Sequence, residues 1–119
     1  MTVKINLRFP TEADARQDAE RVASIIRHGT SVRNVPFRLS CFERPEKEGG
    51  GFGYVLECGT VRVVCRAITR YSVQYHGPEI ARDFDAVLVE DAIAEFRGWL
   101  EARISDFRYA LALTQGPRS

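Results

Sequence analysis

The stretch VRVVCRAITRYSVQY, residues 61–75, decides how this chain folds, because its polar and apolar side chains alternate. The odd positions hold Val61, Val63, Cys65, Ala67, Thr69, Tyr71, Val73 and Tyr75, while the even positions include Arg62, Arg66 and Arg70. A helix would place Val63 and Val73 on its polar side, and the β-branched residues oppose a helix. The pattern therefore predicts a strand. Because fifteen extended residues would run ~50 Å, beyond normal strand length, we expect a bend or break near residues 68–70.

The same period of two occurs elsewhere in the chain. Residues 3–9 alternate Val, Ile, Leu and Phe with polar side chains and stop at Pro10, which predicts a first strand. Residues 37–44 alternate again, and residues 51–57 lead through a short turn at Cys58 and Gly59 into the quoted stretch, a hairpin pattern. Between them, residues 45–53 (PEKEGGGFG) are predicted to form a mobile glycine-rich loop.

Two helices are expected from a spacing of three and four residues. The first begins after Thr11, which forms a capping box with Asp14, and ends near His28, with Gly29 as a left-handed stop. The second is longer and ends before Gly116. Its apolar positions are Val89, Ile93, Phe96, Leu100, Ile104, Phe107 and Leu111. Its start is open, because residues 84–91 (FDAVLVED) fit a short strand as well as a helix capped by Asp85.

These elements give the order β-α-β-β-β-α, an α+β fold with an antiparallel sheet and two helices packed on one face. A chain of 119 residues suits one domain, residues 1–119, with a tail at 115–119. The periods predict a core at the following positions: Val22, Ile26, Leu39, Val63, Cys65, Phe96, Leu100 and Ile104.

The composition excludes several classes of protein. Seventeen basic and sixteen acidic residues leave a net charge of +1, too balanced for a protein that coats DNA or mimics it. No stretch approaches the ~20 apolar residues of a membrane span, and no leader peptide is recognisable, so we expect a cytoplasmic protein. Cys41, Cys58 and Cys65 lack zinc-ligand spacing and are interpreted as reduced thiols.

No sequence motif for catalysis, a cofactor or a metal ion is present, so none of these is expected. His28 and His76 fall at a helix end and a turn, where ordinary structure explains them. The enzymatic alternative is a metal-independent ribonuclease, in which His76 acts as general acid or base while Arg66, Arg70 and Tyr75 hold phosphate.

The arginine row is the main candidate for a binding surface. If the neighbouring strands pair, one sheet face would carry these candidate partner-binding residues: Arg62, Arg66, Arg70, Arg38, Arg44, Val64 and Ile68. Phe42 would lie among them. Cations beside an aromatic ring suit RNA, whereas the apolar Val64 and Ile68 suit a protein partner. The alternative that the face is simply solvated remains open.

The end of the last helix is a second candidate surface. A helix of ~27 residues is ~40 Å long, while a globule of this size is ~35 Å across. Phe107, Tyr109 and Leu111 would therefore need a partner, either a second copy or a target protein. We expect a non-enzymatic module that docks on another protein, with RNA binding by the arginine face as the alternative. Small domains of this kind include regulators and inhibitors carried by phages and other mobile elements.

Overall fold

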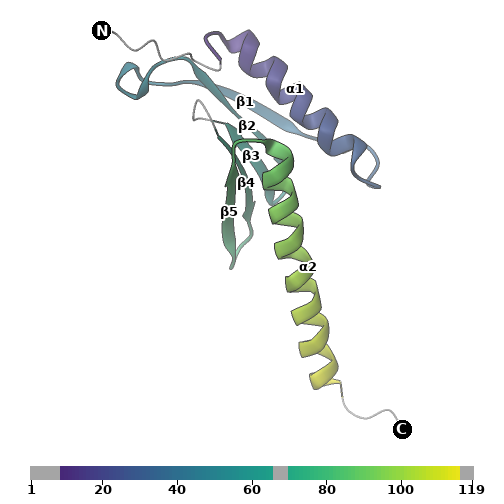
Figure 1. Ribbon diagram of the computed structural model, residues 1–119. Coiled ribbons are helices and arrows are strands. Elements are labelled where there is room, and N and C mark those ends of the chain that lie inside the picture. Colours follow the sequence, from purple (N-terminus) through teal and green to yellow (C-terminus); the bar gives the residue numbers. More distant parts are fainter. Residues whose placement is uncertain (1–8, 66–69, 116–119) are drawn as a thin grey trace.

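The computed structural model describes residues 9–65 and 70–115, which form a five-stranded antiparallel sheet and two long helices (Figure 1). The predicted α+β class is confirmed. The elements are α1 (Glu12–His28), β1 (Arg38–Glu43), the 3-10 helix η1 (Glu46–Glu48), β2 (Phe52–Cys58), β3 (Val61–Cys65), β4 (Tyr71–His76), β5 (Ala81–Ala86) and α2 (Val89–Thr114). The strands lie in the sheet in their chain order, each antiparallel to its neighbours.

The element order differs from the predicted one at residues 61–75. These residues form two strands, and Val61 pairs with Tyr75 across the antiparallel β3–β4 ladder. The expected break is therefore a reversal of the chain. The alternation could not reveal this, because in this ladder odd-numbered residues pair with odd-numbered ones, such as Val63 with Val73, so the inward side keeps the same parity in both strands. The predicted strand at residues 3–9 lies outside the described residues except for Phe9, which is buried.

Of the two alternatives for residues 84–91, the short strand is confirmed at residues 84–86, and the helix capped by Asp85 is wrong. Asp83 and Asp85 belong to strand β5, and α2 begins at Val89 after Leu88, which makes no side-chain capping hydrogen bond. Burial explains the outcome. Phe84 in β5 is only 9% exposed, because the strand alternates Phe84 inward with the two aspartates outward.

The first helix follows its sequence signals more closely. The backbone N–H of Asp14 donates to Thr11 Oγ1 and that of Thr11 donates to Asp14 Oδ2, both at 3.2 Å, so the predicted capping box is confirmed. The helix ends at His28 as expected. Gly29, however, has φ of −91° and is not left-handed; its N–H donates to the carbonyls of Ile25 and Ile26.

The glycine-rich segment at residues 45–53 is partly ordered structure. It contains η1, and its last two residues, Phe52 and Gly53, already belong to β2. Arg44 closes the connection, because its Nη2 donates to the carbonyl of Glu48 at 2.6 Å. The prediction of a loop through all nine residues is therefore wrong at both η1 and the start of β2.

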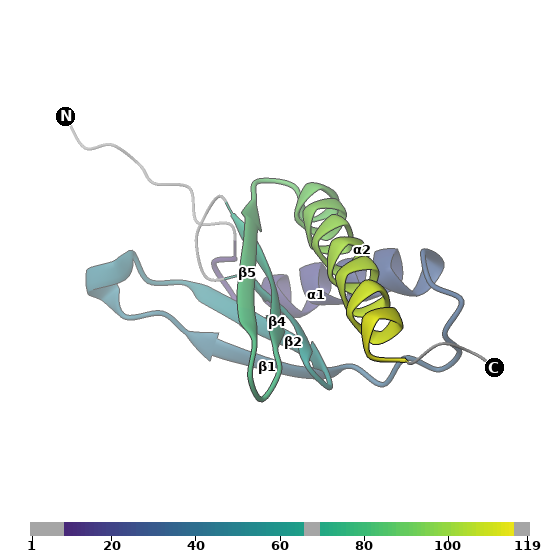
Figure 2. The ribbon, with the colours of Figure 1, turned by 90° about the horizontal axis from the view of Figure 1, so that it is seen from below.

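The hydrophobic core lies on one face of the sheet. One row crosses all five strands and consists of Leu39, Leu56, Val63, Val73 and Phe84. The same cluster contains residues of both helices: Ala15, Ala19 and Val22 of α1, and Val89, Ala92 and Phe96 of α2. Helix α1 contacts β1 and β2, whereas α2 contacts β4 and β5. Figure 2 views α2 nearly end on and shows α1 crossing behind it.

An aromatic group anchors the first half of α2 to the sheet. Phe96 and Trp99 lie with their ring centroids 5.7 and 5.8 Å from that of Phe84, and the Trp99 ring is also 5.7 Å from Tyr75. Such tilted contacts add to the free energy gained by burying the rings. The anchor ends after Leu100, since every residue from 101 to 115 is exposed.

The predicted core is correct apart from its last member. Val22, Val63, Cys65 and Phe96 are buried, and Ile26, Leu39 and Leu100 are partly buried against the same cluster. Ile104 is 48% exposed and was predicted wrongly. Its position in the helical period is suitable for a core, but α2 has left the sheet by that point.

Candidate functional site

The sheet face opposite the core cluster is not covered by α1 or α2, and we call it the open face. It carries Arg38, Ser40, Phe42, Gly53, Val55, Glu57, Arg62, Val64, Ser72, Gln74, Asp83 and Asp85, the positions that alternate with core residues. Side chains of opposite sign share it. Three of the seven predicted partner-binding residues, Arg38, Arg62 and Val64, are on this face.

One row of the open face carries charges of both signs: they alternate from β1 to β3, and the neutral Gln74 of β4 precedes Asp83 of β5. Its members, in order from β1 to β5, are Arg38, Glu57, Arg62, Gln74 and Asp83. Arg62 Nε lies 3.8 Å from Glu57 Oε2, too far for a hydrogen bond, and this buried nitrogen has no hydrogen-bond partner in the described chain. At the far edge, His76 Nε2 lies 3.2 Å from Asp83 Oδ1. The row therefore offers both donors and acceptors to a partner.

The next row supplies apolar area beside these charges. It runs through Ser40, Val55, Val64, Ser72 and Asp85. Val64 is only 2% exposed although it lies outside the main core cluster, so neighbouring side chains already cover it. Near the end of β1, the Phe42 ring leaves no room for a side chain at residue 53, where a Cβ would be 2.5 Å from the ring.

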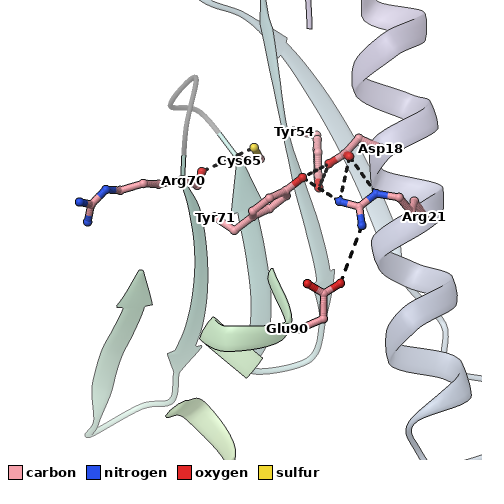
Figure 3. A network of polar contacts seen from close by, with 7 residues as sticks. All are labelled: Asp18, Arg21, Tyr54, Cys65, Arg70, Tyr71 and Glu90. Carbon is pink, nitrogen blue, oxygen red and sulfur yellow. Dashed lines mark hydrogen bonds and ion pairs between the residues drawn. The ribbon is translucent and has the colours of Figure 1, made fainter. Parts of the chain in front are cut away.

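A shallow depression on the open face brings a predicted arginine next to acidic groups. Its lining includes Val64, Arg70, Gln74, Asp83 and Asp85. Figure 3 shows the Arg70 side chain pointing away from α1, opposite to Tyr71. The two aspartates were missed as part of this site, because the sequence pattern of residues 83–91 resembles the acidic start of a helix.

The predicted residues do not all come together. Arg38, Arg62 and Val64 lie on the open face and Arg70 lines its depression. Arg44 instead closes the connection between β1 and β2 through its bond to the Glu48 carbonyl. Arg66 and Ile68 lie outside the described residues.

A polar network on the core side joins α1 to the sheet (Figure 3). Asp18 Oδ2 accepts hydrogen bonds from the hydroxyls of Tyr54 at 2.8 Å and Tyr71 at 2.9 Å. Arg21 donates to Asp18 Oδ1 at 3.1 Å and to the Tyr71 hydroxyl at 2.8 Å, and it lies 3.9 Å from Glu90 of α2. Burial, followed by the Asp18 carboxylate, raises the pKa of Tyr54 far above its ordinary value.

This network was missed at the sequence level although a signal was available. Asp18 lies three residues after Ala15 and four before Val22, so it is on the buried side of α1. A charged residue there needs partners from the sheet, and two tyrosines provide them. Because its groups bond one another, we interpret the network as structural.

The second half of α2 is the other candidate surface. Ile104, Phe107, Tyr109, Leu111 and Leu113 are between 48% and 69% exposed. Figure 1 shows this half extending well beyond the sheet. Among the described residues, no helix is both long enough and apolar enough to cross a membrane.

A groove between the helices leads to this half of α2. It is lined by residues near the end of α1, namely Ile25, Ile26, Gly29 and Thr30, and by Glu90, Ile93, Phe96, Arg97 and Leu100 of α2. This groove could not be predicted from the sequence, because it depends on how the two helices cross. Its apolar lining continues into the exposed side chains of α2 through Leu100.

The candidate metal ligands, the cysteines and Tyr75 bear on whether the described residues could have a chemical role. Residues 9–65 and 70–115 contain no group of three or more His, Cys, Asp or Glu side chains that could hold a metal ion. Cys41, Cys58 and Cys65 are reduced thiols, and burial raises the pKa of the Cys41 thiol, which disfavours its thiolate. Tyr75, assigned to phosphate binding in the ribonuclease hypothesis, packs instead on Trp99 in the core side of the sheet.

Comparisons of the chain with protein-family models, curated proteins and solved structures found no match.

Proposed function

We propose that this protein is a non-enzymatic binding module that docks on another protein through the open face of its sheet. The observation that carries the proposal is the row from Arg38 to Asp83, which brings cationic and anionic side chains together across the five strands. A partner protein can match such a pattern with its own charges of both signs. A regulator or inhibitor would act by this docking.

The balance of charges supports a protein rather than RNA as the occupant. Arg38, Arg62 and Arg70 are accompanied on this side of the sheet by Glu57, Asp83 and Asp85. Among the described residues, these three cations and three anions produce little net attraction for a phosphate backbone, which binds best to surfaces with an excess of positive charge. Val55, which is partly exposed, adds apolar area of the kind found in the centre of protein interfaces.

The ribonuclease alternative has weaker support from the geometry. His76 lies beside Asp83, where its ring nitrogen is 3.2 Å from the carboxylate. Tyr75 has the opposite parity in β4 and packs with aromatic rings of α2. The tyrosine and the histidine therefore do not face a common substrate position.

The proposal can be tested by capture from a lysate with matched charge reversals. Arg62→Glu with Arg70→Glu changes the open face, and Arg16→Glu is the control, because Arg16 is an exposed residue of α1 on the other side of the sheet. We expect wild type and the control to retain one discrete protein after nuclease treatment, and the double variant to lose it.

Two results would contradict this docking face. Capture that disappears with nuclease would identify RNA as the occupant. Capture that survives the double reversal unchanged would show that the open face is only solvated.

A further inference from the structure

The second half of α2 is exposed on every side, which is unusual for an apolar helix. All residues from 101 to 115 are exposed, and Phe107 alone leaves 60% of its surface uncovered. An isolated helix of about this length is marginally stable in water, since helices in proteins gain most of their stability from packing. A second helix packed along it would supply that stabilisation.

Ile104, Phe107 and Leu111 form an apolar seam along one side of this half, whereas Tyr109 and Leu113 lie off it. Leu100, Ile104, Phe107, Leu111 and Thr114 follow one another at steps of 4, 3, 4 and 3 residues. This is the seven-residue repeat with which two helices pack side chains into each other's gaps. Tyr109 is as exposed as Phe107 but lies on the opposite side of the helix.

We propose that a second copy of this chain covers the seam, with the two α2 helices antiparallel. In this arrangement Ile104 packs on Phe107 of the second copy and Leu100 packs on its Leu111. Each contact occurs twice because the pair has two-fold symmetry. The inference concerns α2 and stands independently of the proposed docking face, which the dimer leaves accessible in both copies.

The charges beside the seam select the antiparallel direction. Glu101 and Arg108 occupy equivalent flanking positions one repeat apart, and Arg103 flanks the other side. Antiparallel packing places Glu101 next to Arg108 of the second copy, an opposite pair. Parallel packing would place Arg103 next to Arg108 of the second copy, a like pair that opposes association.

The groove between α1 and α2 provides a place for the end of the second helix. Antiparallel packing centred between Ile104 and Phe107 brings the last turn of the second α2 level with Arg97 and Leu100, two residues that line the groove. The last turn of α2 has no basic residue of its own. Arg97 of the other copy would lie beside those terminal carbonyls, where a cation is favourable.

The mass in solution tests the dimer. Light scattering over a concentration series should give a mass that rises from the 13.5 kDa of one chain to twice that value. Phe107→Glu should weaken the dissociation constant about a hundredfold or more, because both buried rings are lost from the interface centre. Tyr109→Glu is the matched control and should still dimerise.

Circular dichroism separates loss of pairing from loss of the fold. Phe107 is outside the core cluster, so the variant should keep its sheet and its thermal transition at concentrations where both proteins are monomers. A wild type that stays monomeric throughout the series overturns the inference, as does a dimer that Tyr109→Glu disrupts as strongly as Phe107→Glu.

Charge swaps test the direction of the helices. Arg108→Glu should weaken an antiparallel dimer about tenfold, since two attractive pairs become repulsive. Adding Glu101→Arg to the same chain should restore the affinity. If Arg108→Glu instead tightens the dimer, the helices are parallel and the proposed direction is wrong. None of these variants alters the open face, so failure here leaves the proposed function untouched.

Discussion

The two halves of α2 have the same kind of apolar spacing and opposite surroundings. In the first half Val89 is 1% and Phe96 is 8% exposed, whereas in the second half Phe107 and Leu111 are 60% and 58% exposed. The first half packs on β4 and β5, and the second extends beyond them (Figure 1). An apolar stripe on a helix thus indicates a face that packs against something. The length of the sheet determines how much of that face packs within this chain.

The largest difference in the free energy of unfolding should appear when one phenylalanine in each half of α2 is replaced by alanine. Phe96→Ala should lower the free energy of unfolding by about 3 to 5 kcal/mol, because it leaves a cavity among buried rings. Phe107→Ala should change it by less than about 0.5 kcal/mol in the monomer. Denaturant unfolding at low protein concentration measures both. Equal losses would show that the second half packs on its own chain.

A smaller effect should follow from the network that holds α1 beside the first half of α2. Asp18→Ala should cost about 2 to 3 kcal/mol, because two tyrosine hydroxyls and Arg21 lose their shared acceptor. Glu12→Ala, at an exposed ion pair of the same helix, should cost at most about 0.5 kcal/mol. A similar small loss for both variants in denaturant unfolding would contradict the structural role of the network.

The smallest effect is on stability at alkaline pH, where the buried Tyr54 should behave differently from an exposed tyrosine. Burial and Asp18 raise the pKa of Tyr54 in the folded state, while the unfolded chain releases this proton near pH 10. The contribution of the Tyr54 proton to the free energy of unfolding is therefore complete below about pH 10. Above that pH it declines by about 1.4 kcal/mol for each pH unit.

Tyr54→Phe removes this titration, so its unfolding free energy should fall less steeply above about pH 10 than that of wild type. Tyr109→Phe, which removes an exposed tyrosine from the second half of α2, is the control. Parallel curves for Tyr54→Phe and wild type would show that the Tyr54 proton does not contribute.

The local signals of the chain predicted much of the fold. Thr11 and Asp14 determine the start of α1, because a capping box needs only side chains three residues apart. Alternation predicted which residues of 61–65 and 71–75 turn inward, and Val63 and Val73 are indeed buried. It could not predict that these residues form two strands, since pairing across a hairpin is not a property of either segment.

The candidate surfaces were predicted less completely. The arginines at 38 and 62 were placed on one face by parity, but the anions beside them come from β5, which the sequence pattern left undecided. Asp18 could have been noticed as a charge on the buried side of α1, whereas its partners Tyr54 and Tyr71 are 36 and 53 residues away. Long-range contacts of this kind depend on the whole sheet.

Local patterns were enough to predict the start of α1, the inward side of residues 61–65 and 71–75 and the apolar stripe of α2, because these depend on residues a few positions apart. Long-range packing determines that β5 joins the sheet, that anions accompany the arginines and that α2 extends past the sheet after Leu100. The reason is physical. The periodicity of a segment predicts the direction of a side chain relative to its own backbone. Whether that side chain is buried depends on which other segments pack against it.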